Sequence, residues 1–204
     1  MPFDLSWEHW LVVLSAAISI CGSGVYVFDT LRGTTKPNRV TFFLWGFSPL
    51  VAVAASAHVG ADPWTMVRTF IAGFMPLLAF LASFVNPQSY WKLGLFDYAC
   101  GALALFGLSL WFVADSPVLA ILFLAISDGF ACLPTLIKAW RFPETETGFA
   151  YIASLTTALL VIPSIHIWNI ENAAFSVYLV LSNLALVTAI YHKRIVAFLT
   201  ASPG

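Results

Sequence analysis

Long apolar stretches of similar length recur along the whole chain. Each has about 20 residues and almost no charge, and a helix of that length crosses the roughly 30 Å of hydrocarbon in a bilayer. The connecting segments are short, so we expect one transmembrane domain over residues 1–204. The pattern predicts seven membrane-spanning helices at roughly 10–30, 40–58, 63–85, 93–114, 117–140, 148–167 and 172–192.

The composition supports a membrane protein. Of 204 residues, 60% are hydrophobic and 9% are charged, whereas a soluble domain of this size must cover itself with charge. A net charge of −1 without a basic patch argues against binding nucleic acid. Cys21, Cys100 and Cys132 all lie in apolar segments, with neither disulfide nor metal-ligand spacing. We therefore expect no metal site and no cofactor. The acidic flank of the first span, with Asp4 and Glu8, argues against a cleavable signal peptide.

The basic residues predict an orientation for the spans. With the N-terminus outside, eight of the nine fall in cytoplasmic segments, and the ninth, Arg68, lies near the outer end of the third span. Cytoplasmic loops of membrane proteins carry such an excess of Lys and Arg. The C-terminus is then cytoplasmic. The eight are Arg32, Lys36, Arg39, Lys92, Lys138, Arg141, Lys193 and Arg194.

Two stretches of the chain resemble each other at an offset of 106 residues. Each runs from the end of an inward-going span, through a basic loop with proline, into an outward-going span. The matching pairs are Pro37 and Pro143, Thr41 and Thr147, Phe43 and Phe149, and Trp45 and Tyr151. We therefore expect two parallel three-helix repeats, at about 10–85 and 117–194, joined by a linker helix at about 93–114. Some transporters have this plan, with substrate held near the midplane between the halves.

The segment LPTLIKAWRFPETET, together with this 3+1+3 plan and orientation, resembles the SWEET, SemiSWEET and PQ-loop superfamily. That superfamily includes lysosomal amino-acid exporters and, more distantly, the KDEL receptors. Pro134 matches the proline of its Pro-Gln motif, but Thr135 stands where glutamine is usual, and Asp29 replaces the proline in the first repeat. The resemblance implies hinges at prolines, here Pro49, Pro134 and Pro163.

Two polar residues near mid-span are the strongest candidates for a binding site. An ionisable group in hydrocarbon is costly unless it faces a cavity or a partner, and Asp128 lies near the middle of the fifth span. An unpaired carboxylate there could exchange protons with a solute; the alternative is a protonated or helix-capping aspartate. Asn183 lies near the middle of the seventh span, where the resemblance implies a substrate-binding asparagine. Otherwise its amide would join two helices.

Further candidates have an equally plausible structural role. Trp45 and Tyr151 are repeat-related aromatic residues that could form walls of a substrate site, or could simply pack. Asp29 is expected either to pair with Arg32 or to form an inner gate. Three more polar residues are not assigned to the site. Asp97 is expected to pair with a cytoplasmic cation, Arg68 to extend toward the outer surface, and His166 to lie at the interface.

The function favoured by these features is a small-solute transporter that works by alternating access and is linked to protons. The expected partners are the bilayer and a solute of the sugar, amino-acid or vitamin type, and homo-oligomer formation is left open. The expected location is the bacterial inner (plasma) membrane. The alternative is a non-transporting receptor or interaction protein on the same fold. No hydrolase or metalloprotease motif occurs, so an enzyme is not expected.

Overall fold

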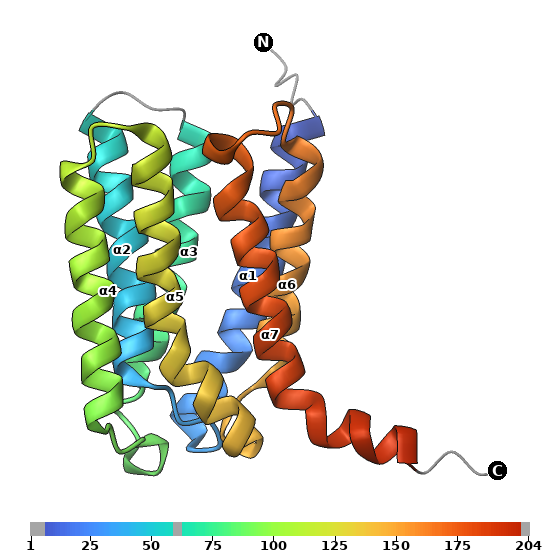
Figure 1. The fold of residues 1–204 in the computed structure, drawn as a ribbon. Coiled ribbons are helices and arrows are strands. Elements are labelled where there is room, and N and C mark those ends of the chain that lie inside the picture. Colours follow the sequence, from blue (N-terminus) through green and yellow to red (C-terminus); the bar gives the residue numbers. More distant parts are fainter. Residues whose placement is uncertain (1–6, 59–62, 201–204) are drawn as a thin grey trace.

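The protein is an all-α bundle of seven helices in a computed structural model that describes residues 7–58 and 63–200 (Figure 1). Asp4 lies outside the described residues. Three short 3₁₀ helices lie in the connections, at Pro87–Ser89, Pro143–Thr145 and Ile162–Ser164. The seven α-helices are α1 (Trp7–Arg32), α2 (Arg39–His58), α3 (Pro63–Ala82), α4 (Leu95–Val113), α5 (Pro117–Arg141), α6 (Gly148–Val161) and α7 (Ile170–Thr200).

The helices agree with the predicted spans except near the C-terminus. Five helices, α1, α2, α4, α5 and α7, are long and apolar enough to cross a membrane, while Met66–Ala82 and Gly148–Ser164 form shorter apolar helices. The sixth span was predicted to reach residue 167, but α6 ends at Val161 and passes into a 3₁₀ turn that contains Pro163. The last helix extends beyond the predicted residue 192 to Thr200.

The outside of the bundle is apolar, which is the distribution of an integral membrane protein in contact with lipid. Leu95, Phe106 and Phe112 are 85%, 62% and 60% exposed. Polar side chains such as Asn38, Thr41 and Ser89 are buried instead. Exposed apolar surface on this scale would be unfavourable in water, and lipid tails remove that cost.

The helices pack as two groups of three with α4 at the side. In the first group α3 packs against both α1 and α2, and in the second α7 packs against both α5 and α6. The groups meet where α1 packs on α6 and α2 on α5, while α4 lies against α5 and α2 (Figure 1). The α1–α6 contact is close, because a β-carbon added at Gly22 would lie 2.4 Å from the β-carbon of Ala153.

The bundle has two ends, which we name by the chain termini. The N-terminal face carries the start of α1, and the C-terminal face carries the end of α7 (Figure 1). The connections α1–α2, α3–α4 and α5–α6 lie at the C-terminal face, together with all eight basic residues assigned to the cytoplasm. Polar contacts hold these connections: Arg39 donates to Ser83 Oγ at 3.0 Å, and Asn86 Nδ2 donates to the Leu31 carbonyl at 2.9 Å.

Candidate functional site: a central cavity with a closed end

A cavity of about 260 Å³ lies inside the bundle, bounded by helices of both groups. Four predicted binding residues line it, one each from α5, α7, α2 and α6: Asp128, Asn183, Trp45 and Tyr151. They come from positions as far apart as residues 45 and 183, yet the fold brings them to one space. We call this space the central cavity. The predicted hinge residue Pro49 also lines it.

The carboxylate of Asp128 has a partner that the sequence did not reveal. The hydroxyl of Tyr178, on α7, donates to Asp128 Oδ2 at 2.7 Å. Asp128 therefore does not cap a helix, since it lies inside α5 and its described bond runs to the neighbouring helix. Its second oxygen can accept a further hydrogen bond.

The amide of Asn183 is partly used within its own helix. Its Nδ2 donates to the Leu179 carbonyl at 2.8 Å, one turn earlier on α7. This bond does not join two helices, which was the structural alternative to a binding role. The amide oxygen is an acceptor, so a solute in the cavity that carries a hydrogen-bond donor has a partner here.

A row of hydroxyls along α1 faces the central cavity and was not predicted from the sequence. Ser15, Ser19 and Ser23 recur at every fourth residue, and all three line the cavity. Residues at that spacing lie on one face of a helix. The signal was therefore present in the sequence as a polar stripe on an otherwise apolar span. Ser154 and Thr157 of α6 add further hydroxyls to the lining.

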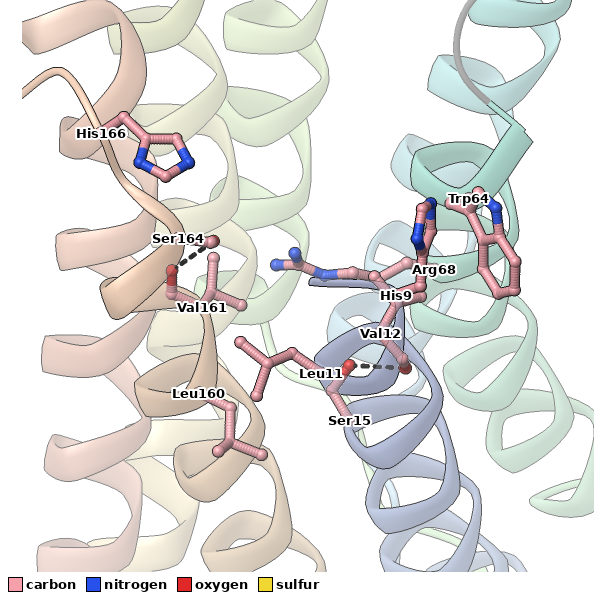
Figure 2. Close-up of a pocket in the computed structure, with 10 residues that line it drawn as sticks. All are labelled: His9, Leu11, Val12, Ser15, Trp64, Arg68, Leu160, Val161, Ser164 and His166. Carbon is pink, nitrogen blue, oxygen red and sulfur yellow. Dashed lines mark hydrogen bonds between the residues drawn. The ribbon is translucent and has the colours of Figure 1, made fainter. Parts of the chain in front are cut away.

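A second cavity of about 320 Å³ lies nearer the N-terminal face, and we call it the vestibule. Figure 2 shows its lining: His9 and Trp64 on one side, and Ser164 and His166 on the other. The rings of His9 and Trp64 lie 4.8 Å apart. Ser15 and Arg68 line both the vestibule and the central cavity, so the two spaces adjoin at these residues.

At the opposite end of the central cavity, buried polar contacts join the two helix groups. Lys138 Nζ of α5 and Glu146 Oε1 form an ion pair at 2.7 Å, with side chains 2% and 0% exposed. The other carboxylate oxygen, Oε2, accepts from the Tyr26 hydroxyl at 2.8 Å and the Tyr151 hydroxyl at 2.9 Å. Tyr26 belongs to α1, so this carboxylate ties the first group to the second. Lys138 also donates to the Lys36 carbonyl.

A further set of bonds lies beside the ion pair and includes Asp29. The hydroxyls of Thr35 and Thr147 lie 2.5 Å apart, and Thr147 donates to Asp29 Oδ2 at 2.8 Å. Asp29 was expected either to pair with Arg32 or to form part of an inner gate. It bonds across the groups to Thr147 instead of pairing with Arg32, whose guanidinium lies 4.0 Å from the centre of the Phe28 ring. We call the whole cluster the seal: Tyr26, Asp29, Thr35, Lys138, Glu146, Thr147 and Tyr151.

No role in a site was predicted for Glu146 or Lys138, although both lie in the segment that carried the family resemblance. Lys138 was counted among the cytoplasmic charges, and Glu146 was treated as part of a loop. Lys138 could have been noticed in the sequence, because it is a charged residue four positions after Pro134 and still inside the helix. No pattern in one sequence indicates that Tyr26, 120 residues earlier than Glu146, supplies the hydroxyl.

The remaining predicted residues lie elsewhere. Pro134 is buried within α5, whereas Pro163 is exposed in the 3₁₀ turn Ile162–Ser164 that directly follows α6. The carboxylate of Asp97 accepts from Asn38 Nδ2 at 2.7 Å and from the Gly94 backbone at 2.5 Å, so its described bonds are not to a cation. In residues 7–58 and 63–200, no three His, Cys, Asp or Glu residues gather to form a metal site.

The chain was compared with protein-family profiles, curated proteins and solved structures, and no match was found in any of the three.

Proposed function

We propose that the protein is a small-solute membrane transporter of the PQ-loop/SWEET type that works by alternating access. One observation carries this proposal: a cavity that Asp128 and Asn183 line lies between two helix groups, and buried bonds join those groups at the C-terminal end of the cavity. A transporter of this kind needs a site between two halves and contacts that close one side at a time. The seal supplies the contacts that would break when the C-terminal face opens.

The packing of the helices supports the two-repeat plan. Within each group the third helix packs against both others, α3 in the first and α7 in the second. The contacts between groups also correspond, because the first helix of each group packs on the second helix of the other: α1 on α6 and α5 on α2. Two repeats related by a twofold axis along the bundle would produce this correspondence. The helix α4 then serves as the linker.

The proposed orientation follows from the basic residues. With all eight at the C-terminal face, that face is cytoplasmic, and the vestibule opens toward the outside. For a bacterial inner membrane, the structure would then represent an outward-facing state. Proton linkage would use Asp128, since a carboxylate in the cavity with a tyrosine as partner can take up and release a proton as the solute binds.

A receptor on the same fold is the second candidate, because a recess that is closed at one end also suits a protein that binds without transporting. The two functions differ in whether a bound solute crosses the membrane. Binding without uptake therefore favours the receptor.

The test is reconstitution of the full chain in liposomes, with binding and uptake measured over a panel of sugars, amino acids, hydroxy acids and vitamins. We expect at least one solute to bind and cross, and we expect Asp128→Asn and Asn183→Ala to lower its uptake by tenfold or more, which corresponds to about 1.4 kcal/mol or more. Asp115→Asn, an exposed aspartate in the α4–α5 connection, is the matched control. Uptake of no solute would overturn the proposal, and wild-type uptake by both cavity variants would overturn the site assignment.

A further inference from the structure

Arg68 lies at the junction of the vestibule and the central cavity. It lines both spaces, and Figure 2 shows its side chain extended from α3 toward Val161 and Ser164 of the opposite wall. From the sequence, this side chain was predicted to extend toward the outer surface. The direction that Figure 2 shows is across the route between the vestibule and the central cavity. A solute that passes from one space to the other must therefore pass the guanidinium.

The guanidinium has no anionic partner in the part of the chain that the structure describes. Among the side chains that the structure describes, Arg68 forms no ion pair and no side-chain hydrogen bond, and no Asp or Glu of that set lines the vestibule. A cation inside a membrane-spanning helix is costly unless it is paired or faces a water-filled space. The polar groups beside it include two imidazoles, His9 and His166, and two hydroxyls, Ser15 and Ser164. None of these side chains carries a negative charge, so the vestibule favours an anion.

The chemistry of the guanidinium narrows the kind of anion. Its N–H donors form a planar fork that matches the two oxygens of a carboxylate, and such paired bonds are stronger than neutral hydrogen bonds. The volume of the central cavity, about 260 Å³, is below the usual range of pocket volumes for drug-sized ligands, so the solute must be small.

The position of Asp128 indicates what the other end of the solute carries. Arg68 is five residues from the start of α3, and Asp128 is eleven residues from the start of α5; both helices start at the N-terminal face. At about 1.5 Å per residue, Asp128 lies roughly 9 Å deeper. A solute of a few carbon atoms bridges that depth when hydrogen bonds at both ends are included. Asp128 and Asn183 there offer oxygen acceptors to a donor group.

We propose that the solute is a small carboxylic acid that also carries a hydroxyl or ammonium group. Its carboxylate binds Arg68, and its donor group faces Asp128 and Asn183. This inference rests on the proposed transport function and specifies the substrate class for the same cavity.

The experiment compares acids with matched neutral or amide analogues. Binding of lactate and its amide, alanine and its amide, and glucuronate and glucose is measured by calorimetry on the full chain in detergent, with uptake measured in liposomes. We expect at least one acid to bind about 10- to 100-fold more tightly than its analogue, the range expected for hydrogen bonds to a charged group. The lactate and alanine pairs show whether the second group is a hydroxyl or an ammonium.

Variants of Arg68 assign the preference to this residue. Arg68→Gln should remove the preference for the acid while changing binding of the neutral analogue less than twofold, and Arg68→Lys should keep part of it. Arg141→Gln, at an exposed arginine on the C-terminal face, is the control. If Arg68→Gln does not fold, the Arg68→Lys variant and the ligand pairs on the wild type still test whether Arg68 binds the carboxylate.

Two results overturn the inference. One is that the neutral analogues bind as tightly as the acids, and the other is that Arg68→Gln lowers the affinities for acid and analogue by the same factor. Uptake of a neutral solute would then leave the transport proposal standing. Binding by no acid in the panel also overturns the inference, and only the absence of uptake for every solute counts against transport as well.

Discussion

The two ends of the central cavity are built in opposite ways. At the C-terminal face, side chains of the two helix groups bond directly to each other, with Glu146 accepting from Lys138, Tyr26 and Tyr151. At the N-terminal face, the vestibule separates α1 from the end of α6, and Arg68 extends into the space between them (Figure 2). Polar bonds between the groups thus lie at one end, and a cavity of about 320 Å³ lies between helices of the two groups at the other.

This difference shows where the protein concentrates its polar interactions. Buried polar groups must be bonded to offset the cost of removing them from water, and the seal satisfies this requirement through contacts between the groups. Such contacts have a defined geometry, so they can exist in one arrangement of the two groups and be absent in another. The following three experiments test the contrast, in order of decreasing effect.

Locking the seal should abolish transport. The hydroxyl oxygens of Thr35 and Thr147 lie 2.5 Å apart, which brings their β-carbons near the separation of a disulfide. In a chain whose three native cysteines are replaced, Thr35→Cys with Thr147→Cys should cross-link on oxidation and lose essentially all uptake. Dithiothreitol should restore uptake, and either single variant should be insensitive to oxidant. Unchanged uptake by the cross-linked protein would show that the seal does not open during transport.

Breaking the buried ion pair should strongly destabilise the fold. Glu146→Gln leaves Lys138 charged and unpaired, and removal of one partner of a buried pair costs about 3–5 kcal/mol. The measurement is unfolding of the purified protein in detergent. Glu144→Gln, two residues earlier and exposed, is the control. The double variant Lys138→Met with Glu146→Gln should recover most of the loss, because it buries no charge and its amide oxygen can still accept from the tyrosine hydroxyls. Equal stability of Glu146→Gln and the wild type would contradict the burial of this pair.

The contact between α1 and α6 at Gly22 should tolerate added side-chain volume less well than the nearby Gly24 does. A methyl group at Gly22 would lie 2.4 Å from Ala153 Cβ, whereas one at Gly24 would meet nothing within 4 Å. Gly22→Ala should therefore cost about 1–3 kcal/mol through overpacking, and Gly24→Ala should be neutral or stabilising by up to about 1 kcal/mol. The same unfolding assay compares them. Equal effects at both positions would mean that α1 and α6 are not in close contact there.

The sequence was sufficient for most of the fold because apolar runs determine where helices can cross a membrane. It failed at α6, where Pro163 follows the apolar run in a 3₁₀ turn instead of continuing the helix. A hydropathy pattern does not distinguish an apolar turn from a further turn of helix, so the predicted end at residue 167 was too late.

The candidate site could be predicted in part because polar and ionisable residues, which are costly to bury in hydrocarbon, are easily recognised in an apolar span. Asp128 and Asn183 could be identified for that reason, and the structure brings them to one cavity. Partners could not be predicted in the same way, because Tyr178 and Tyr26 are ordinary residues in apolar helices. Their roles depend on which helices become neighbours, and a single sequence gives no direct information on that. Glu146 was missed because its burial depends on which helices surround its loop, and its partner Tyr26 comes from the distant helix α1.

The buried Pro134 gives α5 a mechanical property. A proline has no N–H to donate to the carbonyl of Phe130, so the helix bends more easily at this point. Asp128 lies six residues before the proline and Lys138 four residues after it, so the predicted hinge at Pro134 would have arms of about 9 Å and 6 Å. A change of about 20° at the pivot displaces the Lys138 end by about 2 Å, which is enough to separate it from Glu146. The helix α5 thus carries a residue of the cavity and a residue of the seal on opposite sides of one proline.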